Sequence, residues 1–181
     1  MKLNFTHIFV ATGTLSAFLM IDPVLELYFL SPGVIYGFAT VLFLPFFKYY
    51  KHTVLKRFFA RTIWVISSFV SFTGAFYSAT FLYEELGEKG TLVVLSAAGF
   101  VGATILLIGV CIILHILKLK VQWLFAFLIL VAGTVTPIIA TLTLVGFLDG
   151  FLALFLLWQC VISILFLHII DSDHSEQYTQ I

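Results

Sequence analysis

The sequence predicts an all-α integral membrane protein, a bundle of about six transmembrane helices with both termini in the cytoplasm. Composition is the first reason. Of the 181 residues, 62% are hydrophobic and only 10% are charged, whereas a soluble domain has roughly 45 to 50% apolar and about 25% charged residues. Long charge-free runs are the second reason, because a helix crosses a bilayer core of about 30 Å in about 20 apolar residues.

Charged and turn residues divide the chain into six apolar spans. We expect transmembrane helices near residues 5–21, 28–47, 62–83, 91–117, 121–147 and 151–170. The runs are continuous rather than alternating, and lipid accepts a backbone only as helices or closed barrels, so helices are favoured. A single transmembrane domain then covers residues 1–181, with a short cytoplasmic tail at 171–181. The first span is interpreted as a retained helix, because no small-residue cleavage site follows it.

Three spans carry small residues at every fourth position, a pattern that lets helix backbones approach closely in lipid. These residues are Ser67, Ser71, Ala75 and Ala79 in the third span, the pairs Ala98 with Gly102 and Gly99 with Ala103 in the fourth, and Ala132, Thr136 and Ala140 in the fifth. The stripes predict close helix contacts. Two tryptophans at the starts of spans, Trp64 and Trp123, are expected to lie in the interfacial aromatic belt.

Basic residues divide unevenly between the two sides of the predicted membrane. One side has only Lys89, in the outer loop with Glu84, Glu85 and Glu88. The other side has eight, namely Lys2, Lys48, Lys51, Lys56, Arg57, Arg61, Lys118 and Lys120. Basic residues in short loops mark the cytoplasmic face. The chain is therefore expected in a prokaryotic cytoplasmic membrane, with the amino terminus inside and, after an even number of crossings, the carboxyl terminus inside as well.

One sizeable loop, residues 48–61, combines aromatic and basic residues. It suits a short helix on an anionic membrane surface, where each basic residue contributes about 1 kcal/mol. The expected anionic-lipid contacts are Lys48, Lys51, Lys56, Arg57 and Arg61. The alternative is an ordinary determinant of topology with no lipid specificity.

Neutral polar residues gather around a proline in the fifth span. They are Thr134, Thr136 and Thr141, which flank Pro137. A proline inside a helix frees a carbonyl group that threonine hydroxyls or a ligand can satisfy. This segment is therefore a candidate kink with a ligand-binding or gating role, and a purely structural kink is the alternative. Gln159 in the sixth span is a further candidate, since its amide needs a partner in hydrocarbon, although that partner can equally be another helix.

Ionisable groups add few candidates. Asp22 and Glu26 either line a cavity that opens outward or are solvated loop charges. His7, His115 and His168 lie at the cytoplasmic ends of spans and are the candidates for a metal site, although no two share a helix at the spacing that metal ligands use. The catalytic patterns GxSxG, HExxH, GxxxxGK[ST] and GxGxxG do not occur. The sequence indicates no cofactor.

Two interpretations of function remain open. The first is a non-catalytic scaffold or accessory subunit of a membrane complex, which contacts membrane lipids and either other membrane-protein subunits or copies of itself. The second is a small-solute transporter, channel or solute-binding membrane component with a site near the fifth span. In size and topology the chain resembles the substrate-capture components of energy-coupling-factor transporters. A membrane enzyme acting on lipids or quinones is a third possibility, and the formal net charge of zero gives no reason to expect a nucleic-acid partner.

Overall fold

The computed structural model describes residues 31–43, 53–118, 123–144 and 161. These residues are helical apart from short connections, and no strand occurs among them. The elements are α2 (Ser31–Phe43), α4 (Val54–Leu86), the short 3-10 helix η1 (Glu88–Gly90), α5 (Thr91–Leu117) and α6 (Trp123–Leu144). The predicted first span lies outside the described residues, as does the sixth apart from residue 161.

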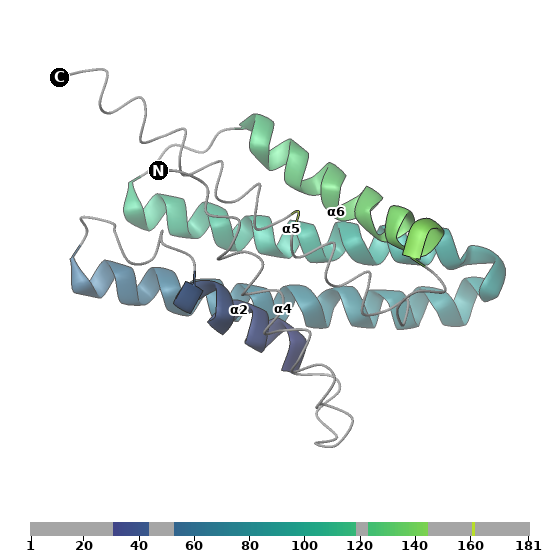
Figure 1. The fold of residues 1–181 in the computed structure, drawn as a ribbon, viewed down its shortest axis with the longest axis horizontal. Coiled ribbons are helices and arrows are strands. Elements are labelled where there is room, and N and C mark those ends of the chain that lie inside the picture. Colours follow the sequence, from purple (N-terminus) through teal and green to yellow (C-terminus); the bar gives the residue numbers. More distant parts are fainter. Residues whose placement is uncertain (1–30, 44–52, 119–122, 145–160, 162–181) are drawn as a thin grey trace.

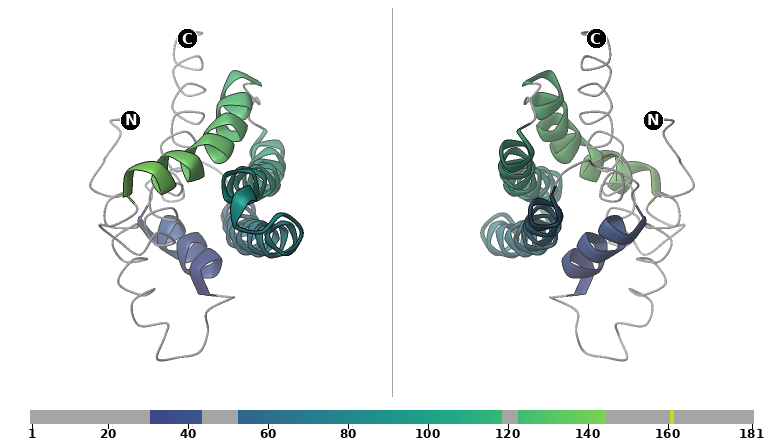
Figure 2. Two further views of the ribbon diagram at one scale, coloured as in Figure 1. Left: turned by 90° about the vertical axis from the view of Figure 1, so that its right-hand side faces the viewer. Right: turned by 90° about the vertical axis from the view of Figure 1, so that its left-hand side faces the viewer.

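The long helices α4 and α5 form an antiparallel hairpin along the molecule (Figure 1). α2 packs beside α4, and α6 packs beside α5, as the views along the hairpin show (Figure 2). The contact between α2 and α4 is close because α2 presents glycine there. A Cβ atom at Gly37 would lie 2.8 Å from the Cα of Val65, and one at Gly33 would lie 2.7 Å from the carbonyl oxygen of Ser68.

The observed helix boundaries agree best with prediction for α5, which covers Thr91–Leu117 as expected. α4 is longer than its predicted span, since it begins at Val54 and ends at Leu86. Residues 54–61 are therefore the first turns of α4 and not a separate short helix on the membrane surface. Thr53 caps these turns, because its hydroxyl oxygen accepts the N–H of Lys56 at 3.5 Å. A helix of this length measures about 50 Å, so it extends beyond a hydrocarbon core of about 30 Å.

A glycine with a left-handed φ connects the two halves of the hairpin. Gly87 ends α4 with φ 60° and ψ −162°, a conformation that is essentially restricted to glycine. Its N–H donates to the carbonyl oxygen of Tyr83 at 2.9 Å, which closes the last turn of α4. The chain then passes through η1 directly into α5, so the two long helices are forced to be neighbours.

Several hydroxyl groups on the long helices are bonded to the helix that carries them. Thr62, Thr73 and Thr104 each donate to the carbonyl oxygen four residues earlier, at distances of 2.8 to 3.0 Å. An unsatisfied hydroxyl in an apolar environment is costly. This local bonding allows threonine and serine to occur within apolar helices without requiring a partner elsewhere.

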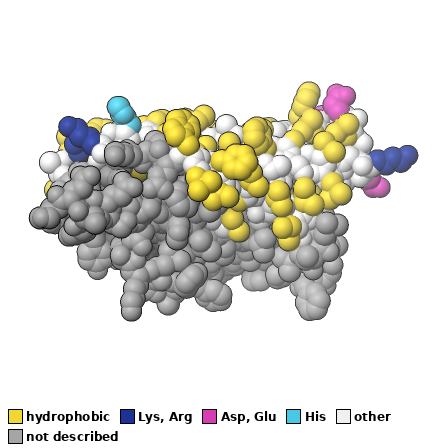
Figure 3. Space-filling model, turned by 90° about the horizontal axis from the view of Figure 1, so that it is seen from above, with side chains coloured by type: hydrophobic (Ala, Val, Ile, Leu, Met, Phe, Trp, Pro, Cys, Tyr) yellow, Lys and Arg dark blue, Asp and Glu magenta, His cyan; other side chains and the backbone are white. Residues whose placement is uncertain are grey.

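The outward faces of the helices are apolar. Along one face of α4, the exposed side chains are Leu55, Phe59, Ile66, Val70, Tyr77 and Phe81, and near its ends Val54, Phe58, Tyr83 and Leu86 are exposed as well. Exposed faces also occur on α5 (Val93, Phe100, Ile108, Ile112) and α6 (Leu124, Leu128, Val131, Val135, Ile139). In Figure 3, charged side chains lie at the two ends of the described surface, with hydrophobic ones between them. Soluble proteins seldom expose apolar surface so continuously. Two described helices, Val54–Leu86 and Glu88–Leu117, are long and apolar enough to cross a membrane, which suggests membrane insertion.

Candidate functional site

α5 presents two adjacent edges of small residues to two different neighbours. On the first edge, the hydroxyl of Ser71 on α4 donates to the carbonyl oxygen of Gly102 at 2.6 Å. On the second edge, a Cβ atom added at Gly99 would overlap the carbonyl oxygen of Gly133 on α6, and one added at Gly133 would overlap the Cβ of Ala103. The predicted stripe of Ala98 and Gly102 therefore packs against α4, and the stripe of Gly99 and Ala103 packs against α6.

The second edge of α5 meets the proline of α6. Pro137 has no N–H, so it leaves the carbonyl of Gly133 without the partner it would have four residues later. The hydroxyl of Thr134 does not take this place, because it donates to the carbonyl oxygen of Leu130 at 2.8 Å. The freed carbonyl faces the backbone of Gly99, an arrangement typical of Cα–H···O contacts between closely packed helices. In this contact, Gly133 and Pro137 lie against Gly99 of α5, and the predicted stripe of Ala132, Thr136 and Ala140 stays a prediction.

The other polar candidates near the proline are placed only in part. Thr136 is buried, with 5% of its surface exposed. Thr141 lies within α6, but its side chain is not among those described. Gln159, Asp22 and Glu26 lie outside the described residues. Their predicted roles therefore stay predictions.

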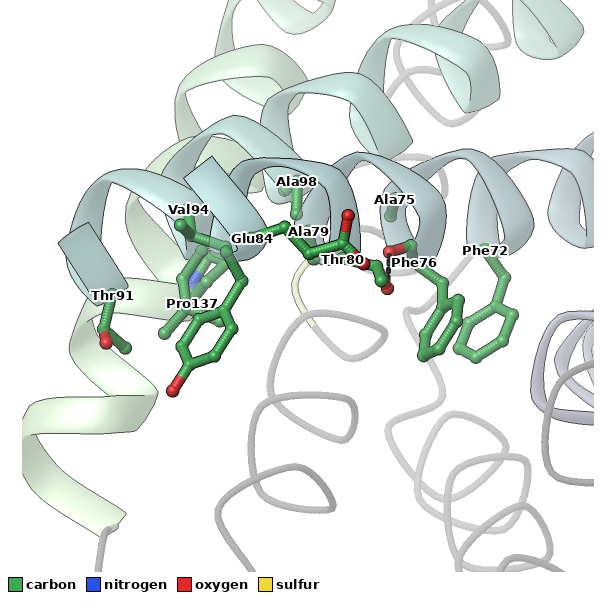
Figure 4. Close-up of a pocket in the computed structure, with 13 residues that line it drawn as sticks. Phe72, Ala75, Phe76, Ala79, Thr80, Glu84, Thr91, Val94, Ala98 and Pro137 are labelled. Carbon is green, nitrogen blue, oxygen red and sulfur yellow. Dashed lines mark hydrogen bonds between the residues drawn. The ribbon is translucent and has the colours of Figure 1, made fainter. Parts of the chain in front are cut away.

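A pocket of about 530 Å³ lies between α4, α5 and Pro137 of α6 (Figure 4). Small residues create it. The small-residue stripe of α4 contacts α5 at Ser71 and continues along the pocket as Ala75 and Ala79. On α5, Ala98 also lines the pocket. Because the side chains on both helices are small, they leave a space between the helices. The volume falls in the range of about 300 to 1,000 Å³ that small-molecule pockets have.

Four of the described lining residues are polar, namely Thr80, Tyr83, Glu84 and Thr91. The rings of Phe72 and Phe76 lie at one end, while Thr91 lies at the other (Figure 4). Two hydroxyl groups of the lining are already bonded to backbone: Thr80 donates to the Phe76 carbonyl oxygen at 3.1 Å, and Thr91 donates to that of Glu88 at 2.7 Å. Among the described lining residues, Glu84 is the one with a charged side chain. The pocket thus combines apolar walls with the carboxylate of Glu84.

The two ends of the hairpin formed by α4 and α5 differ in charge. Its open end combines the first turns of α4 with the last turn of α5 and carries Lys56, Arg57, Arg61 and Lys118. Its closed end carries Glu84, Glu85 and Glu88 together with Lys89. In Figure 3 acidic side chains lie at one end of the described surface and a histidine lies near the other. Of the predicted lipid-contacting residues, Lys48 and Lys51 lie outside the described part of the chain.

The histidine site can be examined at one of its three residues. His115 is exposed in the last turn of α5, and Cys111, one turn earlier, is a free thiol. His7 and His168 lie outside the described residues. Across residues 31–43, 53–118 and 123–144, no three His, Cys, Asp or Glu side chains are grouped closely enough to hold a metal ion.

As a belt residue, Trp64 was expected to be exposed on the surface of the bundle, and this is wrong. The structure buries this side chain fully between α2 and α4, where its indole N–H donates to the hydroxyl oxygen of Thr40 at 2.5 Å. The ring of Tyr36 packs against it at a centroid distance of 6.3 Å. Trp123 is 80% exposed, as expected for a belt residue. Nothing in the sequence distinguishes the two tryptophans, because the partner of Trp64 lies on another helix.

No protein-family model, curated protein or solved structure matches this chain.

Proposed function

We propose that this chain is a six-span protein of a prokaryotic cytoplasmic membrane that acts without catalysis, as a scaffold or accessory subunit of a membrane complex. The observation that carries this proposal is the continuous apolar surface on α4, α5 and α6. Such a surface requires lipid or another membrane protein against it. The hydroxyl groups of Thr62, Ser71 and Thr104 donate to helix backbones, so they contribute to packing.

The charge distribution supports an orientation with both termini inside. The open end of the hairpin, which carries Lys56, Arg57, Arg61 and Lys118, is the cytoplasmic end in this proposal, and the acidic turn around Glu88 is outside. Between Arg61 and Glu84, α4 has no charged residue. At 1.5 Å per residue this segment measures about 33 Å, which fits the hydrocarbon thickness.

A partner test addresses the subunit role directly. The tagged chain is purified from its native membrane in mild detergent, and we expect a second membrane protein to co-purify in fixed stoichiometry. Tryptophan is then placed on each outward face as Val70→Trp, Ile108→Trp and Val135→Trp. The variant on the docking face should lose the partner, whereas those on lipid-facing surfaces should keep it. If the chain is extracted from the native membrane as a monodisperse bundle without any partner protein, the subunit role is contradicted.

The pocket favours a second candidate, a small-solute transporter, channel or solute-binding component of the membrane. It lies beside Pro137, the centre of the predicted binding segment, and its volume suits a small molecule. This candidate predicts that a compound is retained by the purified bundle. Mass spectrometry of the purified protein under native conditions detects such a compound, and its absence across several detergents contradicts this candidate.

A further inference from the structure

We propose that the pocket between α4, α5 and Pro137 binds a lipophilic amine, a molecule with one hydrocarbon chain and a cationic amine head. This inference rests on the second candidate function, the solute-binding component, and names its ligand class. Three properties of the pocket carry it: its depth in the membrane, its apolar walls and the charge of Glu84.

The pocket has the depth of one lipid leaflet. Its lining on α4 extends from Phe72 to Glu84, a rise of about 18 Å along the helix. Phe72 lies at the middle of the charge-free segment 62–83, and Glu84 is the first charged residue beyond it. Since half of the hydrocarbon core is about 15 Å thick, the pocket reaches from the bilayer centre to its boundary. An extended hydrocarbon chain of the outer leaflet spans the same distance.

The walls suit a hydrocarbon chain. Ala75, Ala79 and Ala98 leave the space open, and the rings of Phe72 and Phe76 close its deep end (Figure 4). Burial of apolar surface is the main favourable term for such a ligand. Because the hydroxyls of Thr80 and Thr91 are bonded to the backbone, the walls retain no free hydroxyl proton at these positions for binding a polar group along the chain.

The charge of Glu84, the lining residue farthest along α4, selects the head group. The Glu84 carboxylate belongs to the lining, and Glu85 and Glu88 lie within one turn of chain from it, against a single cation at Lys89. An anionic head would meet like charge here, whereas a protonated amine would meet opposite charge. The depth profile and the charge together therefore specify a chain with a basic head.

Photolabelling tests the proposal. The full chain is reconstituted into phosphatidylcholine vesicles with a long-chain alkylamine that carries a diazirine near the end of its chain, or with the matched photoreactive fatty acid. Peptide mass spectrometry then identifies the labelled residues. We expect the amine to label the Phe72–Ala79 segment on its pocket side, to be displaced by unlabelled alkylamine, and to label it more strongly than the fatty acid does.

Two pairs of variants test separately how the amine head and the hydrocarbon chain contribute to binding. Glu84→Gln should lower amine labelling about fivefold, the upper range for an exposed ion pair, whereas Glu85→Gln, outside the lining, should lower it by less than about twofold. Ala79→Phe fills the pocket and should abolish labelling, whereas Val70→Phe adds similar bulk to the outward face of the same helix and should not. The circular dichroism of each variant establishes that the bundle is folded.

The outcomes distinguish this inference from the function on which it rests. Equal labelling of the pocket by amine and fatty acid, or equal effects of Glu84→Gln and Glu85→Gln, overturns the amine proposal and leaves a solute-binding component. Labelling confined to outward residues such as Val70 and Tyr77, with either probe, overturns both.

Discussion

The indole N–H of Trp64 donates a hydrogen bond to the hydroxyl oxygen of Thr40, and this bond joins α4 to α2 where both side chains are fully buried. The Thr40 hydroxyl donates in turn to the carbonyl oxygen of Tyr36 at 2.7 Å. Each polar group thus has a partner in an apolar contact, where an unsatisfied one costs about 1 to 3 kcal/mol. This requirement fixes how α2 lies against α4.

Replacing Trp64 should therefore weaken the contact between α2 and α4. We expect Trp64→Phe to lower the free energy of unfolding by about 1 to 3 kcal/mol, because the bond to Thr40 and part of the buried ring are lost. Trp123→Phe is the control, since that side chain is 80% exposed, and it should change stability by less than about 0.5 kcal/mol. Unfolding in mixed micelles measures both. Equal effects of the two substitutions argue against the buried bond.

Two glycines of α5 should respond differently to an added methyl group. In Gly99→Ala the new Cβ overlaps a backbone carbonyl oxygen, that of Gly133, which cannot rotate away. We expect a loss of about 1 to 3 kcal/mol. In Gly102→Ala the nearest atom, the Cβ of Ala75, would be 3.2 Å away, so a small shift accommodates it and stability should change by less than about 1 kcal/mol. Thermal unfolding in detergent ranks the pair, and the reverse ranking contradicts the close approach of α5 and α6.

The hydrogen bond between α4 and α5 should contribute a measurable but modest amount. Ser71→Ala removes the bond to the Gly102 carbonyl, and interhelical bonds of this kind in membrane proteins average about 0.6 kcal/mol. Ser96→Ala is the matched control, because the Ser96 hydroxyl donates within its own helix to Leu92 at 2.7 Å. Unfolding by denaturing detergent should show a loss for the first variant only. A larger loss of stability for Ser96→Ala than for Ser71→Ala would contradict a stabilising hydrogen bond between Ser71 and Gly102.

Cysteine labelling tests the proposed orientation. In a background with Cys111→Ser and Cys160→Ser, a cysteine at Glu88 should react with a membrane-impermeant maleimide applied outside intact cells. Cysteines at Lys56 and Lys118 should react only after the membrane is opened, because the hairpin places these residues at the opposite end. The opposite pattern means that the bundle is inverted, and equal reaction at all three sites contradicts membrane insertion of the hairpin.

Charge and hydropathy predicted the helices well where charged residues lie at their ends. α5 matches its predicted bounds because Lys89 and Lys118 flank an uninterrupted apolar run. The start of α4 was placed too late, because residues 54–61 are polar enough to resemble a loop yet continue the helix. Hydropathy distinguishes segments that lie in lipid from segments that lie in water. It does not distinguish a helix that extends into the membrane interface from a loop in the same place.

The candidate site was predicted only at Pro137. A proline in an apolar helix is visible in a sequence, and it does line the pocket. The pocket itself is formed by the absence of side-chain volume at Ala79 and Ala98, on two helices whose relative register the sequence does not specify. The carboxylate of Glu84 was expected only as part of a solvated loop. It is exposed, as expected, and what the sequence did not reveal is that it lines this pocket.

The two small-residue edges of α5 also make this helix sensitive to its own length. Ala98 and Gly99, and likewise Gly102 and Ala103, are neighbours in sequence and so point about 100° apart around the helix. Deleting one residue between Thr91 and Ala98 rotates the remainder of the helix by that angle relative to its start. Large side chains would then turn toward α4 or α6 where small ones are needed. Point substitutions of its leucines and isoleucines should consequently be tolerated far better than single-residue insertions or deletions.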